Sequence, residues 1–325
     1  MTNRLSEFEV IERFFAPLAS APGAFGLKDD AAIVAPRPGF DLVLKTDTIV
    51  AGVDFFADGP AEAVAKKALR VNLSDLAAKG AVPFAYLLTL SLPSVDVEWL
   101  GAFADGLRAD QERFGCTLHG GDISSTPGPL TVTVAAFGHV PQGRMLRRNG
   151  AKAGDLVFVT GTIGDSGGGL AVLKESNSHL NKDQRDFLVA RYRVPEPPVA
   201  FGPRLIGIAS AALDVSDGLI ADLGHLAGAS HVGIVVDAPR VPLSPALRAL
   251  WGEDEKAVAR AATAGDDYQI AFTAAAGKEQ ALVEAAAACG VQITRIGRVE
   301  QGSGVELRGA DGRAIAVPKP GFTHF

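Results

Sequence analysis

Aspartates are the residues of this sequence that most suggest chemistry, because several lie where a strand or a helix is expected to begin or end. Asp47 closes an apolar run, Asp75 lies in a helical pattern, Asp122 follows two glycines, and Asp214 and Asp217 flank a strand-to-helix turn. Short carboxylates of this kind suit Mg²⁺, which commonly also binds phosphate oxygens. Converging carboxylates would otherwise repel, because two unit charges about 4 Å apart interact by roughly 4 kcal/mol at an effective dielectric constant near 20. Together the aspartates favour a site for Mg²⁺ and phosphate.

Each aspartate also has a simpler structural explanation. Asp75 has the spacing for an i,i+4 ion pair with Lys79 on a solvated helix face. Asp217 or Ser216 could cap the helix that follows, and Asp122 could close an Asx turn. For Asp75 alone the ion pair is the better explanation, and only the whole set makes a metal site the more economical reading.

Arginines offer a second feature with two explanations. Arg144, Arg147 and Arg148 lie within a stretch rich in glycine and basic residues. They could form a solvated linker turn, or they could clamp a phosphate, because guanidinium groups match phosphate geometry. The sequence alone narrowly favours the linker turn.

Other sites for phosphates, metals or nucleophiles lack their motifs. The chain has no GxxxxGK[ST] loop and no GxGxxG fingerprint after a strand. Its histidines and its two cysteines lack metal-ligand spacing. The stretch GDSGGG at 164–169 resembles a serine-protease loop but lies between an expected strand and an expected helix, so we interpret it as a coincidence.

Composition and charge restrict the class of protein. The chain has 325 residues, 47% of them hydrophobic and 21% charged, and a formal net charge of −6. Without a block of Lys and Arg, binding to nucleic acid through a broad basic surface is not expected. No apolar stretch is long enough to span a bilayer, and the start resembles no signal peptide. We therefore expect a cytoplasmic protein that binds neither nucleic acid nor membrane.

The elements that position the aspartates mix strands and helices without strict βαβ repetition. A capping box at Ser6 and Glu9 predicts a first helix. Residues 141–155 interrupt the pattern with Gly, Pro and basic residues, which predicts domains 1–150 and 151–325. We expect two α/β (α+β) domains rather than one doubly wound sheet. The expected strands are 30–36, 41–47, 85–92, 130–140, 155–161, 233–238, 268–273 and 291–299, and the main expected helices are 60–79 and 97–115.

Motifs in a specific order extend over almost the whole chain. They are DDAAIV, KTDTIVAGVDFF, KALRVNLSDLAAKGA, HGGD, GRMLRRNGAKAGDLVFVTGTIGDS, LDVSDGLIADLGHL, AGDDYQIAFT and GFTHF. In these motifs the chain resembles the thiamine-monophosphate kinase family of the aminoimidazole ribonucleotide synthetase-like superfamily. The resemblance implies two domains of that type and a homodimer whose N-terminal sheets meet.

The resemblance also implies an activity and its residues. ATP would donate its γ-phosphate to thiamine monophosphate by direct in-line transfer in a cluster of several Mg²⁺ ions, giving thiamine diphosphate. The N-terminal domain would bind metal and ATP, and the C-terminal domain would complete the site. The implied metal ligands are Asp30, Thr46, Asp47, Asp75, Asp122, Asp214 and Asp217, with Asp30, Asp47, Asp75 and Asp122 catalytic, and Gly121, Asp122, Arg148 and Ser216 contacting the nucleotide.

Departures from the family's pattern lie on the acceptor side. Asp54 stands where the family usually has His, Asp266 where it has Glu, and Lys319 where it often has an aromatic residue. These three residues are the expected acceptor contacts. Three alternatives are another ATP-using member of the superfamily, a metal-dependent phosphatase, and a silent binding protein for thiamine phosphates. Against the first, the chain lacks the reactive cysteines that mark some relatives. Against the second, it lacks a DxDx[TV] motif.

Overall fold

The computed structural model describes residues 5–175, 179–317 and 319–322. Its contacts divide the chain into two compact units. The N-terminal unit comprises Met1–Leu76 and Ala81–Gly143, and the C-terminal unit comprises Ala77–Gly80 and Arg144–Phe325. Both units combine helices with a β-sheet, which confirms the expectation of two mixed α/β domains.

The first helix, α1 (Glu7–Val10), begins at the predicted capping box. The Ser6 side chain accepts a hydrogen bond from the Glu9 backbone, and the Glu9 carboxylate accepts one from the Ser6 N–H at 2.7 Å. The helix buries Val10, and the short π-helical and 3₁₀ turns that continue it to Leu18 bury Phe14 and Phe15.

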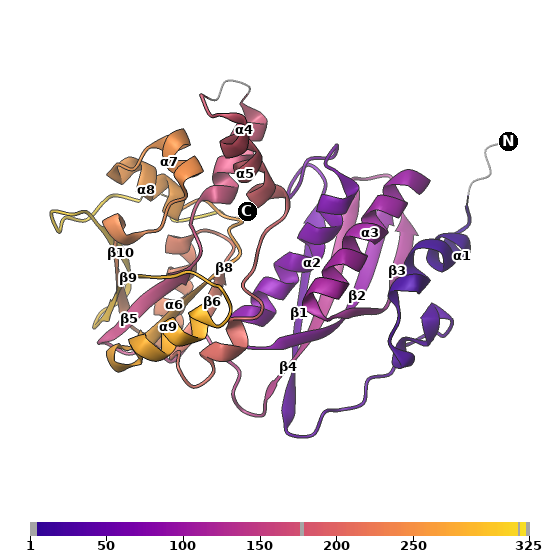
Figure 1. The fold of residues 1–325 in the computed structure, drawn as a ribbon, viewed down its shortest axis with the longest axis horizontal. Helices are drawn as coiled ribbons and strands as arrows, with labels where there is room; N and C mark the ends of the chain where they lie inside the picture. The colour runs from indigo at the N-terminus through magenta and orange to yellow at the C-terminus, as the bar shows by residue number, and fades with distance from the viewer. Residues whose placement is uncertain (1–4, 176–178, 318, 323–325) are drawn as a thin grey trace. The chain divides into compact units, whose positions relative to one another are not determined.

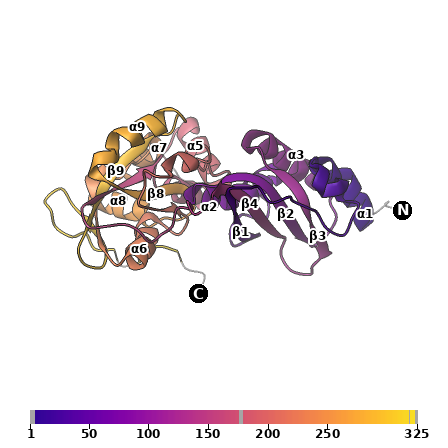
Figure 2. The same ribbon diagram turned by 90° about the horizontal axis from the view of Figure 1, so that it is seen from below.

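A four-stranded sheet with two long helices on one face forms the rest of the N-terminal unit (Figure 1). The strand order is β1-β4-β2-β3, in which only β2 and β3 run parallel. Figure 2 shows no helix of the described N-terminal residues on the opposite face of this sheet. The elements are β1 (Phe40–Val50), α2 (Ala61–Ala78), β2 (Val82–Leu92), α3 (Val97–Phe114), β3 (Thr117–Ser125) and β4 (Thr131–Pro141).

A buried ion pair joins α2 to α3. The Arg70 guanidinium donates to both carboxylate oxygens of Asp110, at 2.7 and 2.8 Å. Removing one partner of such a pair leaves an uncompensated buried charge, which typically costs about 3–5 kcal/mol. The pair therefore restrains the helix that carries Asp75.

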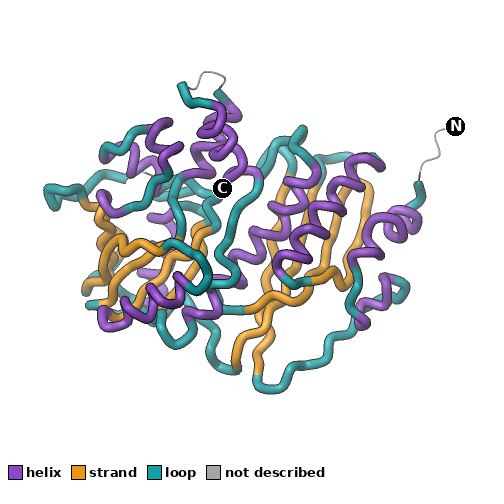
Figure 3. The backbone as a smooth tube through the Cα atoms, in the orientation of Figure 1, coloured by secondary structure: helices purple, strands orange, loops and turns teal. Residues whose placement is uncertain are grey.

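Two local predictions about the N-terminal unit were wrong. Residues 30–36, expected as a strand, belong to the exposed stretch without regular structure before β1, drawn as loop in Figure 3. Conversely, Asp122 lies inside strand β3 and not in an Asx turn. Its preceding glycine is needed for close packing, because a Cβ at Gly121 would lie 1.7 Å from the carbonyl oxygen of Leu88.

The C-terminal unit contains a six-stranded mixed sheet in the order β10-β7-β9-β5-β8-β6. No helix in the described part of the chain is both long and apolar enough to cross a membrane. The elements are β5 (Asp155–Thr160), α4 (Asp165–Lys174), α5 (Lys182–Arg193), β6 (Ala211–Val215), α6 (Leu219–Ser230), β7 (Gly233–Asp237), α7 (Pro245–Trp251), α8 (Glu255–Ala262), β8 (Gln269–Ala275), α9 (Glu279–Ala287), β9 (Ile293–Glu300) and β10 (Gly304–Arg308).

Candidate functional site

Two of the predicted aspartates of the N-terminal unit meet around one lysine. The Lys45 ammonium lies 2.8 Å from Asp75 Oδ2 and 3.1 Å from Asp47 Oδ1. Lys45 and Asp47 are two residues apart on β1 and so point to the same face, where Asp75 reaches them from α2. Asp75 therefore pairs with Lys45 and not with Lys79, the partner that its helical spacing suggested. Lys79 Nζ donates to the Ala212 carbonyl at 3.0 Å.

Burial and neighbouring charges set the electrostatics of this cluster. Burial raises the pKa of the Asp47 carboxyl, and the negative charges of Asp75 and Asp54 add to this effect, against the opposing attraction of Lys45. Burial alone would lower the pKa of Lys45, but Asp75 and Asp47 more than offset it and the pKa is raised. Without added ions, the cluster therefore has an excess of carboxylates with one resident cation, an arrangement that suits a divalent metal.

Asp54 lies in the loop after β1 and is held by its backbone and its side chain. Asp54 Oδ2 accepts a hydrogen bond from the Val50 N–H at 2.8 Å. Lys67, only 1% exposed, donates from Nζ to the Asp54 carbonyl at 2.9 Å. The charge of Asp54 acts on Asp47. This predicted acceptor contact therefore lies close enough for its charge to affect the cluster.

Asp122 lies on the opposite face of the sheet from Asp47. Its register partner on β2 is Thr89, and Thr89 pairs with Thr133, whose hydroxyl lies 2.8 Å from that of Thr48. Thr48 follows Asp47 directly and therefore points to the other face. Three strand spacings of about 4.8 Å further separate β1 from β3 by roughly 14 Å. A single chain therefore does not bring Asp122 to the cluster around Lys45.

Two other predicted ligands have hydrogen-bond partners outside this cluster. Thr46 points to the open face and donates from its hydroxyl to the Val134 carbonyl at 3.1 Å. Asp30 is exposed in the loop before β1, and its N–H donates to the Asp29 side chain at 2.8 Å. Their assignment as metal ligands stays a prediction.

In the C-terminal unit, Asp214 is buried within strand β6, and Ser216 and Asp217 lie in the turn between β6 and α6. Asp222 holds this turn, because its Oδ2 accepts hydrogen bonds from the backbone N–H groups of Ser216, Asp217 and Gly218 at 3.0, 3.0 and 3.1 Å. Neither Ser216 nor Asp217 caps α6 with its side chain. The turn instead leaves both side chains partly exposed.

Asp217 also belongs to a group of potential metal ligands that sequence reasoning missed. One carboxylate oxygen each of Asp217 and Asp222 and one ring nitrogen of His225 lie within 4.8 Å of one another. The i,i+3 spacing of Asp222 and His225 on a helix is the sequence feature that could have indicated it.

Asp266 is held against the same turn by a strained loop. Asp266 and Tyr268 both have positive φ, at 67° and 50°, which is uncommon outside glycine. Their N–H groups donate to the Ser216 and Val215 carbonyls, both at 2.7 Å, and Tyr268 OH donates to Asp266 Oδ1 at 3.1 Å. The loop therefore places a predicted acceptor contact beside Ser216.

The end of the described chain reaches this turn as well. The Phe322 N–H donates to the Asp217 carbonyl at 2.9 Å. Lys319, the third predicted acceptor contact, is exposed three residues earlier. The last three residues of the motif GFTHF lie outside the described residues.

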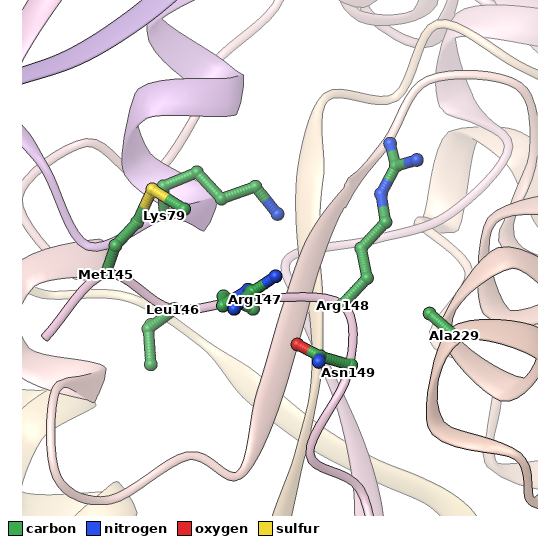
Figure 4. Close-up of a pocket in the computed structure, with 7 residues that line it drawn as sticks. All are labelled: Lys79, Met145, Leu146, Arg147, Arg148, Asn149 and Ala229. Atoms are coloured by element: carbon green, nitrogen blue, oxygen red, sulfur yellow. The ribbon is translucent and has the colours of Figure 1, made fainter. Parts of the chain in front are cut away.

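Arg148 lines a basic pocket of 410 Å³ with Lys79 and Arg147 (Figure 4). The Arg148 carbonyl accepts a hydrogen bond from Ser230, at the end of α6. Ser216 precedes the beginning of this helix, whose 12 residues span about 18 Å. The structure therefore places the backbones of these two predicted nucleotide contacts at opposite ends of α6, and the pocket's charge suits an anion.

Asp267, next to Asp266, is a buried carboxyl that anchors the start of α4. Its Oδ2 accepts a hydrogen bond from the Gly164 N–H at 2.7 Å. Burial raises the pKa of this carboxyl well above its usual value, against the opposing effect of the backbone donors, and Asp165 raises it further. The folded chain therefore binds this proton more readily than the unfolded chain does.

We expect the substitution Asp267→Asn to remove a pH dependence of stability. The folded-state pKa lies above the ordinary value of 3.8, so wild-type stability should fall as pH rises from that value towards the raised pKa. Urea unfolding between pH 4 and pH 8 should show the variant gaining on the wild type with rising pH. The exposed Asp186→Asn serves as control, and parallel curves for Asp267→Asn and the wild type would contradict the prediction.

Both units of the chain match known protein families. The description "AIR synthase related protein, N-terminal domain" fits residues 28–140, and the corresponding C-terminal domain fits residues 152–310. A thiamine-monophosphate kinase of Caulobacter vibrioides is 42% identical over 324 residues, which are 98% of this chain and 91% of the relative.

Solved structures agree with the sequence relatives. A crystal structure of thiamine-monophosphate kinase from Stenotrophomonas maltophilia K279a has a TM-score of 0.86 and 41% identity, over 96% of this chain and 98% of that one. The structure called AaThiL complexed with AMPPCP and TMP has a TM-score of 0.79 and 33% identity, over 100% of both chains.

Proposed function

The chain belongs to the thiamine-monophosphate kinase family of the AIR synthase-related proteins, and on that premise we propose that it transfers the γ-phosphate of ATP to thiamine monophosphate. The meeting of Asp47 and Asp75 around one cation is the observation that carries the proposal. AaThiL, which is similar over its whole length, has been solved with AMPPCP and TMP. Strand β1 and helix α2 supply these two carboxylates. Two phosphate-bearing substrates would need cations between them, and the carboxylates could hold such cations.

The chemistry requires little proton transfer. The acceptor is a phosphate monoester with a second pKa of about 6, so it is mostly a dianion at neutral pH. The obstacle is repulsion between this dianion and the polyphosphate of ATP, and positioning with charge stabilisation dominates such reactions. Bound Mg²⁺ would supply positive charge between the two anions.

The residues of the chain would hold these components in place. Asp54, Asp266 and the exposed Lys319 would contact the acceptor, and Asp222 fixes the turn that presents Ser216. The basic pocket at Arg148 suits part of the nucleotide's phosphate chain. We propose that Asp30, Thr46, Asp47, Asp75, Asp122, Asp214 and Asp217 hold several Mg²⁺ ions, and that Gly121, Asp122, Arg148 and Ser216 contact ATP.

We further propose that two copies of the chain form a homodimer through the open face of the N-terminal sheet. On β1 this face presents Leu42 and Leu44, which are 52% and 63% exposed, and on β2 it presents Leu87. An antiparallel sheet normally turns polar residues to water on its solvated face. A contiguous exposed apolar face instead indicates a protein interface.

Replacing Leu44 by aspartate should convert the dimer into a monomer, because each copy would bury an uncompensated charge in the interface. Light scattering coupled to size-exclusion chromatography measures the change. Val283→Asp is the matched control, because Val283 is 55% exposed on α9 of the other unit. A monomeric wild type, or an unchanged dimer in Leu44→Asp, would contradict the interface.

Asp122 lies on this open face and therefore on the side of the proposed interface. We propose that it acts together with the Lys45 cluster of the second copy. A single chain separates Asp122 from Asp47 by three strands and by the thickness of the sheet. If both aspartates hold ions of one site, as the resemblance implies, a second copy has to bring them together.

One assay tests the activity. Purified protein is incubated with ATP, Mg²⁺ and either thiamine or thiamine monophosphate, and thiamine diphosphate is measured. Product from the monophosphate alone, with one ADP formed per product, supports the kinase. Acceptor-independent release of phosphate would favour a phosphatase, and tight binding of the monophosphate without ADP would favour a silent binding protein.

A further inference from the structure

Lys45 lies where a metal ion bridging Asp47 and Asp75 would be expected. Its ammonium lies within 3.1 Å of one oxygen of each carboxylate. Lys45 comes from the same strand as Asp47, and its side chain is only partly exposed. The two carboxylates therefore already share one cation that belongs to the chain.

A divalent ion and this ammonium compete for the same position. Mg²⁺ needs oxygen ligands at about 2.0–2.1 Å, closer than the hydrogen bonds that Lys45 makes here. An ion entering between the two carboxylates would lie directly beside a positive charge and be repelled by it. It could bind there only if Lys45 left both partners.

We propose that Lys45 is a resident cation of the carboxylate cluster and takes the place of one divalent ion between Asp47 and Asp75. The inference rests on the proposed function, which puts metal ions at these aspartates. Lys45 orders the two carboxylates before any metal binds, and it leaves their other oxygens for ions held with further ligands. With Lys45 in place, the chain needs one divalent ion fewer at this pair than a chain with a neutral residue at position 45.

Counting bound ions in the full-length chain tests the inference. Lys45→Met removes the charge and keeps an unbranched stem. We expect this variant to bind one more Mn²⁺ per chain than the wild type, or to bind one Mn²⁺ more tightly by on the order of tenfold. Free Mn²⁺ is measured by electron paramagnetic resonance without nucleotide. Equal numbers and affinities, or weaker binding in Lys45→Met, would overturn the inference.

Two further variants complete this experiment, one as a control and one as a replacement. Lys66→Met is the matched control, because Lys66 lies on α2 and pairs with Glu62; its Mn²⁺ binding should equal that of the wild type. If circular dichroism shows that Lys45→Met does not fold, Lys45→Gln replaces it with the same expected result. The count does not depend on thiamine diphosphate formation, so a chain without kinase activity would refute the proposed function and leave this comparison standing.

Thermal unfolding gives a second readout. A ligand that binds the folded state raises the unfolding temperature with its affinity. Adding Mg²⁺ to metal-free protein should therefore raise the unfolding temperature of Lys45→Met more than that of the wild type. An equal or smaller rise in the variant would overturn the inference.

Discussion

Replacing Asp47 by alanine is expected to lower kcat for thiamine diphosphate formation by roughly 10²- to 10³-fold, a typical cost of removing one group that stabilises transition-state charge. Asp47 provides a carboxylate to the cluster at Lys45, and Asp75 alone would have to hold the cations there. The loss should appear in kcat rather than only in KM. The cations that Asp47 helps to hold balance the negative charge of the two phosphates, and this matters most when the two anions react.

The same substitution should leave the fold intact. Burial, with the charges of Asp75 and Asp54, holds the pKa of Asp47 above its ordinary value of 3.8. The folded chain therefore binds a proton more readily than the unfolded chain, and ionised Asp47 lowers stability above that pKa. At neutral pH without metal, Asp47→Ala should unfold at the same temperature as the wild type or higher.

Kinetics and thermal unfolding on the same preparations check this prediction. Asp105→Ala is the control, because Asp105 is exposed on α3 and pairs with Arg108 on the outside of the helix. Near-normal kcat in Asp47→Ala would refute its role in the metal cluster. A fall of kcat together with a lower unfolding temperature would instead indicate a structural role.

Elements with a clear apolar pattern were predictable from the sequence, short strands included: those expected at 155–161 and 233–238 are Asp155–Thr160 and Gly233–Asp237. The helix expected at 60–79 is Ala61–Ala78, and the strand expected at 130–140 is Thr131–Pro141. Strand β4 buries alternate residues, and α2 carries apolar residues at helical spacing although it is buried almost all round, so both patterns are long enough to recognise. The run 30–36 has only a short alternation. Strand β3 contains polar residues and a glycine, Gly121, that the close approach of the Leu88 carbonyl of β2 requires.

The candidate site was predictable only in part, because its contacts join distant segments. The spacing could not show that Asp75 on a helix reaches Lys45 on a strand. Alternation along β1 does place Lys45 on the face of Asp47, and that feature was available in the sequence. The same alternation separates Asp47 from Thr46, whereas the position of Asp122 depends on the register of four strands.

Asp222 illustrates a second limit. Its sequence position, in the first turn of α6, suggests an exposed acid near a helix start. In the structure it turns back and accepts three backbone hydrogen bonds. Each donor left buried without a partner would cost about 1–3 kcal/mol. The residue that fixes the turn is therefore not one of those that the resemblance assigned to metal or nucleotide.

The separation of Asp47 from Asp122 leads to the second large effect, a rescue of activity between two inactive variants. Asp47→Ala and Asp122→Ala should each be inactive alone. If Asp122 acts with the cluster of the second copy, a mixed dimer contains one site with both substitutions and one site with neither. Random mixing makes half of the dimers mixed, so activity should recover to about a quarter of the wild-type value.

The rescue requires exchange of subunits, so the two variants are unfolded and refolded together or are co-expressed with different tags. Purification through both tags in sequence isolates mixed dimers, whose activity should reach about half that of the wild type. Mixing Asp47→Ala with Asp75→Ala is the control. Both residues belong to one cluster on one chain, so every mixed site keeps one defect and activity should stay low. No recovery with Asp122→Ala would show that Asp122 does not act across the interface, because a site built from one chain leaves each site of the mixed dimer with one substitution. Recovery in the control would show that Asp47 and Asp75 do not act in one site of one chain.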